Sequence, residues 1–111
     1  MRSKKVLIID DEEDFGFLMN EFFSKKGYTV FIASSIAEGL QLLESEHPDF
    51  IFLDNNLPDG LGWGETEFIL MNYPQTQLNL ISAMEVPKTS AASFNILYKP
   101  FIKDELNKIF S

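Results

Sequence analysis

Short apolar runs alternate along the chain with segments in which apolar residues recur every three or four positions. Each run is rich in β-branched or aromatic residues and is bounded by polar or turn-forming residues, which predicts a buried strand. The five runs lie at residues 6–9, 28–32, 50–53, 78–81 and 94–98. Strands that are apolar on both faces are typical of a parallel sheet with helices on both sides.

The segment after the first run predicts an amphipathic helix, capped by Asp14 or an earlier acidic residue and ended by Gly27. Its apolar positions follow the spacing of one helix face: Phe15, Leu18, Met19, Phe22 and Phe23. A second helix begins with the capping-box pattern from Ser35 to Glu38 and ends at His47-Pro48. Further helices are expected at residues 63–73 and 102–110, whereas residues 83–93 are ambiguous.

Strand and helix alternate through the whole sequence without an internal repeat or a linker. This order predicts an α/β fold, a three-layer, doubly wound, five-stranded parallel sheet with right-handed crossovers. The sheet and its helices form one domain over residues 1–111.

The composition argues against disulfide-bonded, membrane-spanning and nucleic-acid-binding proteins. Cysteine is absent, which excludes disulfides and thiolate metal sites. No apolar run is long enough to span a membrane, so we expect a cytoplasmic protein without membrane contact. The formal net charge is −8, from 17 Asp and Glu against 9 Lys and Arg. Such an acidic chain is repelled by phosphate backbones, so direct nucleic-acid binding is not expected.

Polar side chains follow four of the five predicted strands. Asp10 and Asp11 follow the first strand, Asp54 the third, Ser82 the fourth and Lys99 the fifth. Because the carboxyl ends of parallel strands meet at one edge of the sheet, these side chains are expected to lie together. Clustered carboxylates repel one another unless a cation such as Mg²⁺ binds them. A metal and a lysine suit phosphoryl transfer, in which an aspartate can be the nucleophile.

Each residue alone also has an ordinary structural interpretation. The two adjacent aspartates could be a helix N-cap, and Asp54 could be a turn residue ahead of Pro58-Asp59-Gly60. Lys99-Pro100 alone is typical of a loop, and Ser82 alone suggests nothing beyond a local hydrogen bond. The functional interpretation depends on all of them falling at strand ends in chain order.

The whole chain resembles the receiver domain of two-component response regulators. The segments that carry the resemblance are VLIIDDEEDF, FIFLDNNLPDG, LISA and LYKPF. It implies a flavodoxin-like fold with strand order 2-1-3-4-5. It also implies a phosphoacceptor signalling domain rather than an enzyme, with a sensor histidine kinase or histidine phosphotransfer protein as phosphodonor and an unknown downstream protein target.

The resemblance also implies roles for individual residues. Asp54 accepts the phosphoryl group, and Asp10, Asp11, Asp54 and the Asn56 backbone carbonyl hold Mg²⁺. Ser82 takes the switch hydroxyl position, and Lys99 pairs with the phosphoryl group. The family's switch aromatic is replaced by Ile96. The interval from Ser82 to Lys99 is short for the family by roughly five residues, more than one helical turn, so a shortened or irregular fourth helix is expected.

Two other functions are alternatives for this pattern. The short 83–93 segment and Ile96 favour a receiver-fold interaction module with weak or no phosphorylation-driven switching, whereas the full set of polar strand ends opposes it. A flavin carrier or aspartate-nucleophile phosphatase on a similar fold is disfavoured. The first needs a phosphate-binding loop where this chain is acidic, and the second needs a D-x-D pattern on its first strand.

Overall fold

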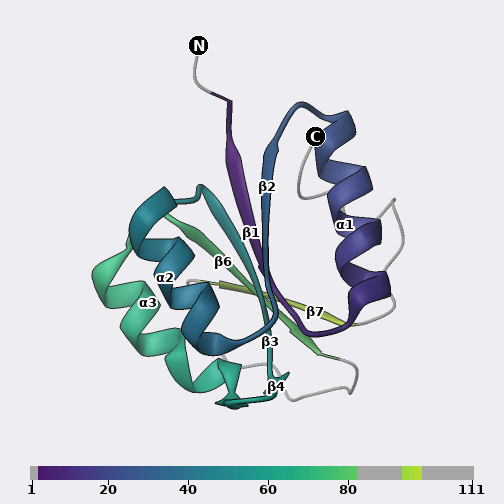
Figure 1. Ribbon diagram of the computed structural model, residues 1–111. Coiled ribbons are helices and arrows are strands. Elements are labelled where there is room, and N and C mark those ends of the chain that lie inside the picture. The colour runs from purple at the N-terminus through teal and green to yellow at the C-terminus, as the bar shows by residue number, and fades with distance from the viewer. Residues whose placement is uncertain (1–2, 83–93, 99–111) are drawn as a thin grey trace.

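The computed structural model describes residues 3–82 and 94–98, and a five-stranded parallel sheet forms its centre (Figure 1). Its strands are β1 Lys5–Ile9, β2 Thr29–Ala33, β3 Phe50–Asp54, β6 Gln77–Ser82 and β7 Phe94–Tyr98. Neighbouring strands follow the order β2-β1-β3-β6-β7. The parallel α/β architecture predicted from the apolar runs is therefore confirmed. No strand begins or ends more than one residue away from its predicted limit. Lys99, residues 83–93 with the expected fourth helix, and the final helix lie outside the described residues.

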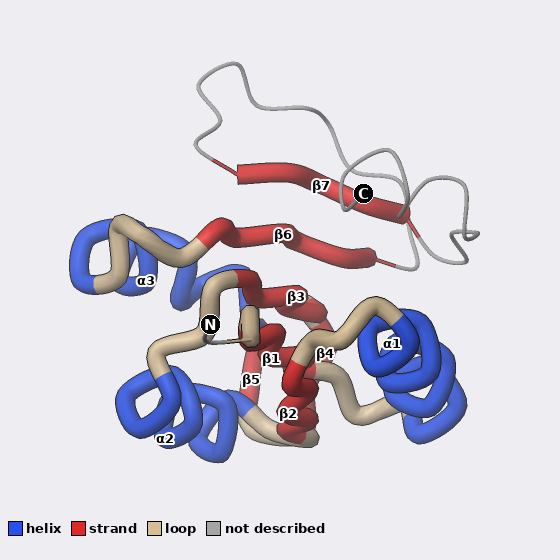
Figure 2. Tube along the Cα trace, turned by 90° about the horizontal axis from the view of Figure 1, so that it is seen from above, coloured by secondary structure: helices blue, strands red, loops and turns tan. Residues whose placement is uncertain are grey.

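Helix α1, Glu13–Lys25, covers one face of the sheet, and helices α2, Ile36–Glu46, and α3, Thr66–Asn72, cover the other. Figure 2 shows these two helical layers on opposite sides of the strands. None of the helices within residues 3–82 is long and apolar enough to cross a membrane.

Helix α1 ends as its sequence predicts. Gly27 has a positive φ of 86°, and its N–H donates to the carbonyl of Ser24 at 3.0 Å. The next N–H, from Tyr28, donates to the carbonyl of Phe23 at 3.0 Å, which completes a Schellman motif. The rings of Phe23 and Tyr28 pack 5.2 Å apart over this end. At the other end the N-cap is Glu12, an acidic residue before Asp14 as predicted, but its side chain makes no capping hydrogen bond.

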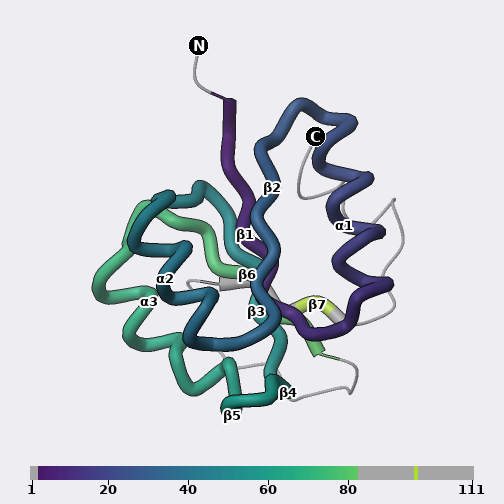
Figure 3. The backbone as a smooth tube through the Cα atoms, viewed as in Figure 1, coloured from purple at the N-terminus to yellow at the C-terminus, as the bar shows by residue number. Residues whose placement is uncertain are grey.

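Residues 55–65 differ most from the sequence expectation. The chain leaves β3 and forms a two-stranded antiparallel ribbon, β4 Asn56–Leu57 and β5 Gly60–Leu61 (Figure 3). A 3₁₀ helix, Gly62–Glu65, follows and leads into the short helix α3. The predicted helix at residues 63–73 therefore begins in a tighter turn, which the hydrogen bonds of Trp63 described below hold in place.

Two apolar cores lie on the two faces of the sheet. Under α1, Phe23 is fully buried and contacts Phe52 of β3, with ring centroids 5.6 Å apart. Under α2 and α3, Ile9, Leu53 and Ile69 pack together with other aliphatic residues. Leu18, predicted on the core face of the first helix, is instead exposed, and so are the apolar residues Phe68 and Met71 of α3.

Candidate functional site

The carboxylates predicted at the strand ends lie close together. Asp10 directly follows β1, and Asp54 is the last residue of β3. One carboxylate oxygen from each of Asp10, Asp11 and Asp54 lies within 4.8 Å of the other two. Asp10 and Asp54 are buried, with 2% and 6% of their surface exposed, whereas Asp11 is exposed. The sequence-predicted cluster therefore forms at the carboxyl edge of the sheet.

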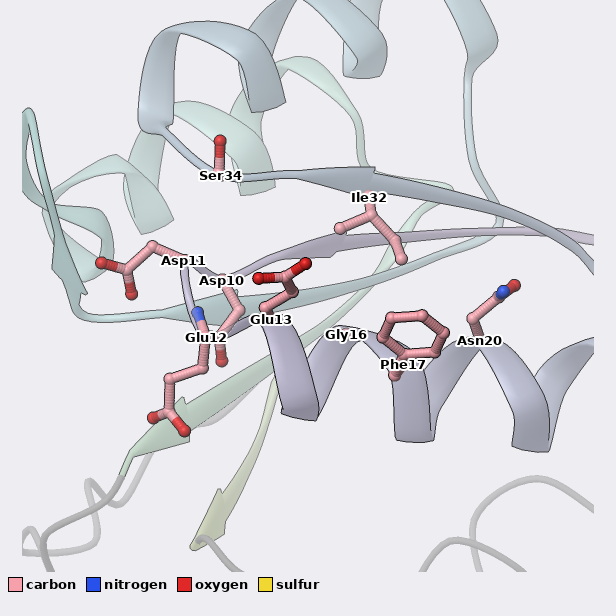
Figure 4. Close-up of a pocket in the computed structure, with 9 residues that line it drawn as sticks. All are labelled: Asp10, Asp11, Glu12, Glu13, Gly16, Phe17, Asn20, Ile32 and Ser34. Atoms are coloured by element: carbon pink, nitrogen blue, oxygen red, sulfur yellow. The ribbon is translucent and has the colours of Figure 1, made fainter.

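The backbone holds Asp10 in place. Its N–H donates to the carbonyl of Ala33 at the end of β2, at 2.9 Å. Its Oδ1 accepts the backbone N–H of Glu12 at 2.9 Å, which turns the chain from the strand toward α1. Figure 4 shows the side chains of Asp10 and Asp11 beside the start of this helix.

The electrostatics of the cluster favour a hard cation. Three carboxylates that share a site repel one another, and burial of two of them raises the cost of their charge. Oxygen ligands from carboxylates are the donors that Mg²⁺ and Ca²⁺ prefer, and one exposed member leaves an open side for water or substrate oxygens. The donor set therefore fits a divalent cation of this class.

The remaining predicted site residues divide into those that the structure describes and those that it does not. Ser82 is buried at the end of β6, one residue after Ile81, which pairs with Asp54. Asn56 is exposed and opens the β4–β5 ribbon, two residues after Asp54. Ile96 pairs through its backbone with Leu80. Lys99 lies outside the described residues.

A turn formed by Gly62 and Trp63 lies directly against the segment around Asp54. The indole N–H of Trp63 donates to the carbonyl of Leu53 at 3.1 Å, and its backbone N–H donates to Oδ1 of Asn55 at 3.1 Å. The N–H of Gly62 donates to the carbonyl of Asn55 at 2.8 Å. Nothing in the sequence indicated these bonds.

Asp59 was predicted as a turn residue, and the structure gives it a second role. Its carboxylate accepts the backbone N–H groups of Ile36 and Ala37, at 2.8 and 3.0 Å. Ser35 accepts the next N–H, from Glu38, at 3.1 Å, as the capping-box pattern predicts. The bonds from Ile36 and Ala37 hold the pKa of Asp59 below its usual value of 3.8. The ribbon after Asp54 is thereby tied to the first turn of α2.

Comparisons with known proteins agree on one family. The chain matches the profile described as "Response regulator receiver domain" over residues 6–111. It is 38% identical over 63 residues to sporulation initiation phosphotransferase F of Bacillus subtilis, covering 55% of this chain and 51% of that protein. It is 32% identical over 111 residues to the regulator of RpoS of Escherichia coli, covering 96% of this chain and 32% of that protein.

Solved structures give the same result for the fold. A CheY-like receiver domain protein from Methanospirillum hungatei superimposes with a TM-score of 0.85 at 26% identity, covering 97% of this chain and 91% of that one. Among the curated relatives, the chain spans about half the length of the Bacillus protein. It spans about a quarter of response regulator protein PilR of Pseudomonas aeruginosa and about a third of the regulator of RpoS of Escherichia coli.

Proposed function

The chain belongs to the response regulator receiver domain family, whose members are signalling domains of two-component systems, and we propose that Asp54 is its phosphoacceptor. The phosphodonor is a phosphohistidine on a sensor kinase or phosphotransfer protein, and the protein works in the cytoplasm on a downstream protein target rather than on nucleic acid. One relative is itself named a phosphotransferase.

The approach of the Asp10, Asp11 and Asp54 oxygens to within 4.8 Å carries the proposal. A carboxylate oxygen of Asp54 attacks the phosphorus of the phosphohistidine, the P–N bond breaks, and the imidazole leaves as it gains a proton. The product is an acyl phosphate on Asp54. Such a transfer depends on positioning and charge neutralisation more than on covalent help from other side chains.

Asp10, Asp11, Asp54 and the Asn56 backbone carbonyl would hold Mg²⁺, which when bound neutralises the carboxylates and the incoming phosphoryl oxygens. Buried Asp10 is oriented by its bond from Glu12, and exposed Asp11 leaves the approach open. Three carboxylates without a cation would repel a phosphoryl group.

The hydroxyl of Ser82 donates a hydrogen bond to a phosphoryl oxygen. Ser82 is buried at the end of β6, directly after the residue that pairs with Asp54, which supports this role. Lys99 pairs with the phosphoryl group. Ile96 has neither a ring nor a hydroxyl to follow Ser82, so coupling to the surface does not use the family's aromatic switch.

The test is intact mass after incubation with acetyl phosphate and Mg²⁺. We expect one added phosphoryl group on the wild type, none on Asp54→Ala, and none after EDTA. Asp49→Asn, at the opposite end of β3, is the matched control and should be modified like the wild type. Failure of the wild type under conditions that phosphorylate an ordinary receiver would leave the interaction module, which the comparisons do not favour.

A further inference from the structure

A groove of about 370 Å³ lies between helix α1 and strand β2. Its apolar part is formed by Gly16, Phe17 and Ile32, and its acidic end by residues 10–13 (Figure 4). β2 is an edge strand of the sheet, so the side of α1 that lines the groove faces away from the central strands. The groove therefore extends from the proposed phosphorylation site along the outer side of the molecule.

The groove exists because residue 16 has no side chain. A Cβ added to Gly16 would lie 3.6 Å from two methyl carbons of Ile32, which is ordinary van der Waals contact. Glycine within a helix is less favourable than alanine, because it loses more backbone freedom on folding. Neither packing nor helix propensity therefore requires glycine at residue 16. The absence of a side chain there leaves Ile32 accessible to solvent.

Two large apolar side chains are exposed along the groove. Phe17 is 71% exposed and Ile32 is 43% exposed. Figure 4 shows the Phe17 ring and Gly16 side by side on α1, with the Ile32 side chain on the facing strand. Apolar side chains that gather at a concave surface are typical of a binding site.

The charge around the groove is of one sign. Asp11, Glu12 and Glu13 are exposed at one end, and no lysine or arginine is among the residues that line it. At the other end, Asn20 offers an uncharged amide. A ligand that combines an apolar part with a cation is complementary to this surface, and the acidic end also accelerates its association.

We propose that the groove binds a short segment of a partner protein in which an aliphatic side chain adjoins a lysine or arginine. The aliphatic group sits over Gly16, between Phe17 and Ile32. The cationic group reaches Asp11, Glu12 and Glu13. Asp11 is also a proposed Mg²⁺ ligand, so the acidic end adjoins the proposed phosphorylation site. The apolar part, formed by Gly16, Phe17 and Ile32, takes no part in phosphoryl transfer.

The smallest probe with this chemistry is n-hexylammonium, with hexanol and hexanoate as neutral and anionic controls of the same length. Titrated into the ¹⁵N-labelled protein without Mg²⁺, hexylammonium should shift the amide signals of Gly16, Phe17, Asn20 and Ile32 in a saturable way. Hexanol should bind several-fold more weakly, and hexanoate should leave these signals in place. The preference for the cation should shrink in high salt.

Four variants distinguish binding in the groove from binding to the carboxylates alone. Gly16→Leu fills the groove and should abolish saturable binding, whereas Gly16→Ala should raise the melting temperature and weaken binding only in part. Phe17→Ser changes an exposed side chain and provides a second test if Gly16→Leu does not fold. Glu12→Gln with Glu13→Gln should reduce the preference for hexylammonium over hexanol.

Two results would overturn the proposal. If hexylammonium shifts the same signals in Gly16→Leu and Phe17→Ser, the amine binds the carboxylates alone. If hexanoate binds as well as hexylammonium, or if no signal in the groove moves, the surface lacks the stated complementarity.

Discussion

The indole N–H of Trp63 donates a hydrogen bond to the backbone carbonyl of Leu53, the residue immediately before Asp54. That carbonyl and the N–H of Asp54 belong to one planar peptide group, so the indole fixes its orientation. The N–H of Gly62 donates to the carbonyl of Asn55, the residue immediately after Asp54. The backbone on both sides of Asp54 is therefore held by a single turn of the chain.

Replacing Trp63 with phenylalanine keeps an aromatic ring but removes the indole donor. We expect unfolding free energy to fall by about 1 kcal/mol, the usual net value of such a bond. Phosphorylation of Asp54 by acetyl phosphate should slow by roughly tenfold, because small misplacements of reacting groups are costly. Urea denaturation followed by circular dichroism and time-resolved intact mass measure the two effects.

Tyr73→Phe is the control for Trp63→Phe, because Tyr73 packs against the same apolar core and lies outside the turn. Its phosphorylation rate should equal that of the wild type. A Trp63→Phe variant with lower stability but an unchanged rate would assign Trp63 to packing alone.

Gly62 lies so close to Asp54 that a side chain would not fit. An added Cβ would fall inside van der Waals contact with the carbonyl oxygen of Asp54 and press on methyl groups of Leu53 and Leu57. Gly62→Ala should therefore destabilise the protein by about 1–3 kcal/mol, as overpacking does, and weaken Mg²⁺ binding. Gly64 has nothing within 4 Å of the same position, so Gly64→Ala should change stability by less than about 0.5 kcal/mol. Equal melting curves for the two variants would contradict this account.

The sheet and the acidic cluster were predictable from the sequence for the same physical reason. A run such as residues 50–53 has no polar position, so it must be covered on both faces, and parallel strands then place their ends together. Asp10, Asp11 and Asp54 follow from that geometry without knowledge of any side-chain contact. Each of these predictions depends only on local pattern and on the topology of the fold.

Contacts made between distant loops could not be predicted in this way. The bonds from Ile36 and Ala37 to Asp59 join residues that are 23 and 22 positions apart, and any short polar residue in the loop would have suited the turn. The sequence also does not show which apolar residues of a helix face the core, as Phe68 and Met71 illustrate. Helix α3 is short and buries Ile69 instead, so both side chains are exposed.

A divalent cation at the acidic cluster should stabilise the protein. At ten times its dissociation constant, Mg²⁺ should add about 1.4 kcal/mol, which corresponds to a rise in Tm of roughly 5 °C. Asp11→Asn should abolish this gain and should itself raise Tm without metal, since it removes one of three like charges within 4.8 Å. Thermal unfolding in MgCl₂ and in NaCl of matched ionic strength measures both effects.

Asp49→Asn should keep the full response to Mg²⁺, because Asp49 precedes β3 and lies at the opposite edge of the sheet. An equal rise in Tm for wild type and Asp11→Asn would show that the cation acts elsewhere.

The link between Asp59 and helix α2 predicts a pH-dependent contribution to stability. The backbone N–H groups of Ile36 and Ala37 lower the pKa of Asp59 from 3.8 in the folded state. The carboxylate therefore stabilises the fold fully above pH 3.8, and this contribution is lost as the pH falls through the folded-state pKa. Asp59→Asn retains one acceptor oxygen and loses the charge, so its urea midpoint should lie below that of the wild type at pH 7. The two midpoints should approach each other as the pH falls below 3.8. Glu44→Gln, a change at an exposed carboxylate on α2, should show no such convergence. A deficit for Asp59→Asn that stays constant with pH would assign the effect to the shape of the side chain rather than to its charge.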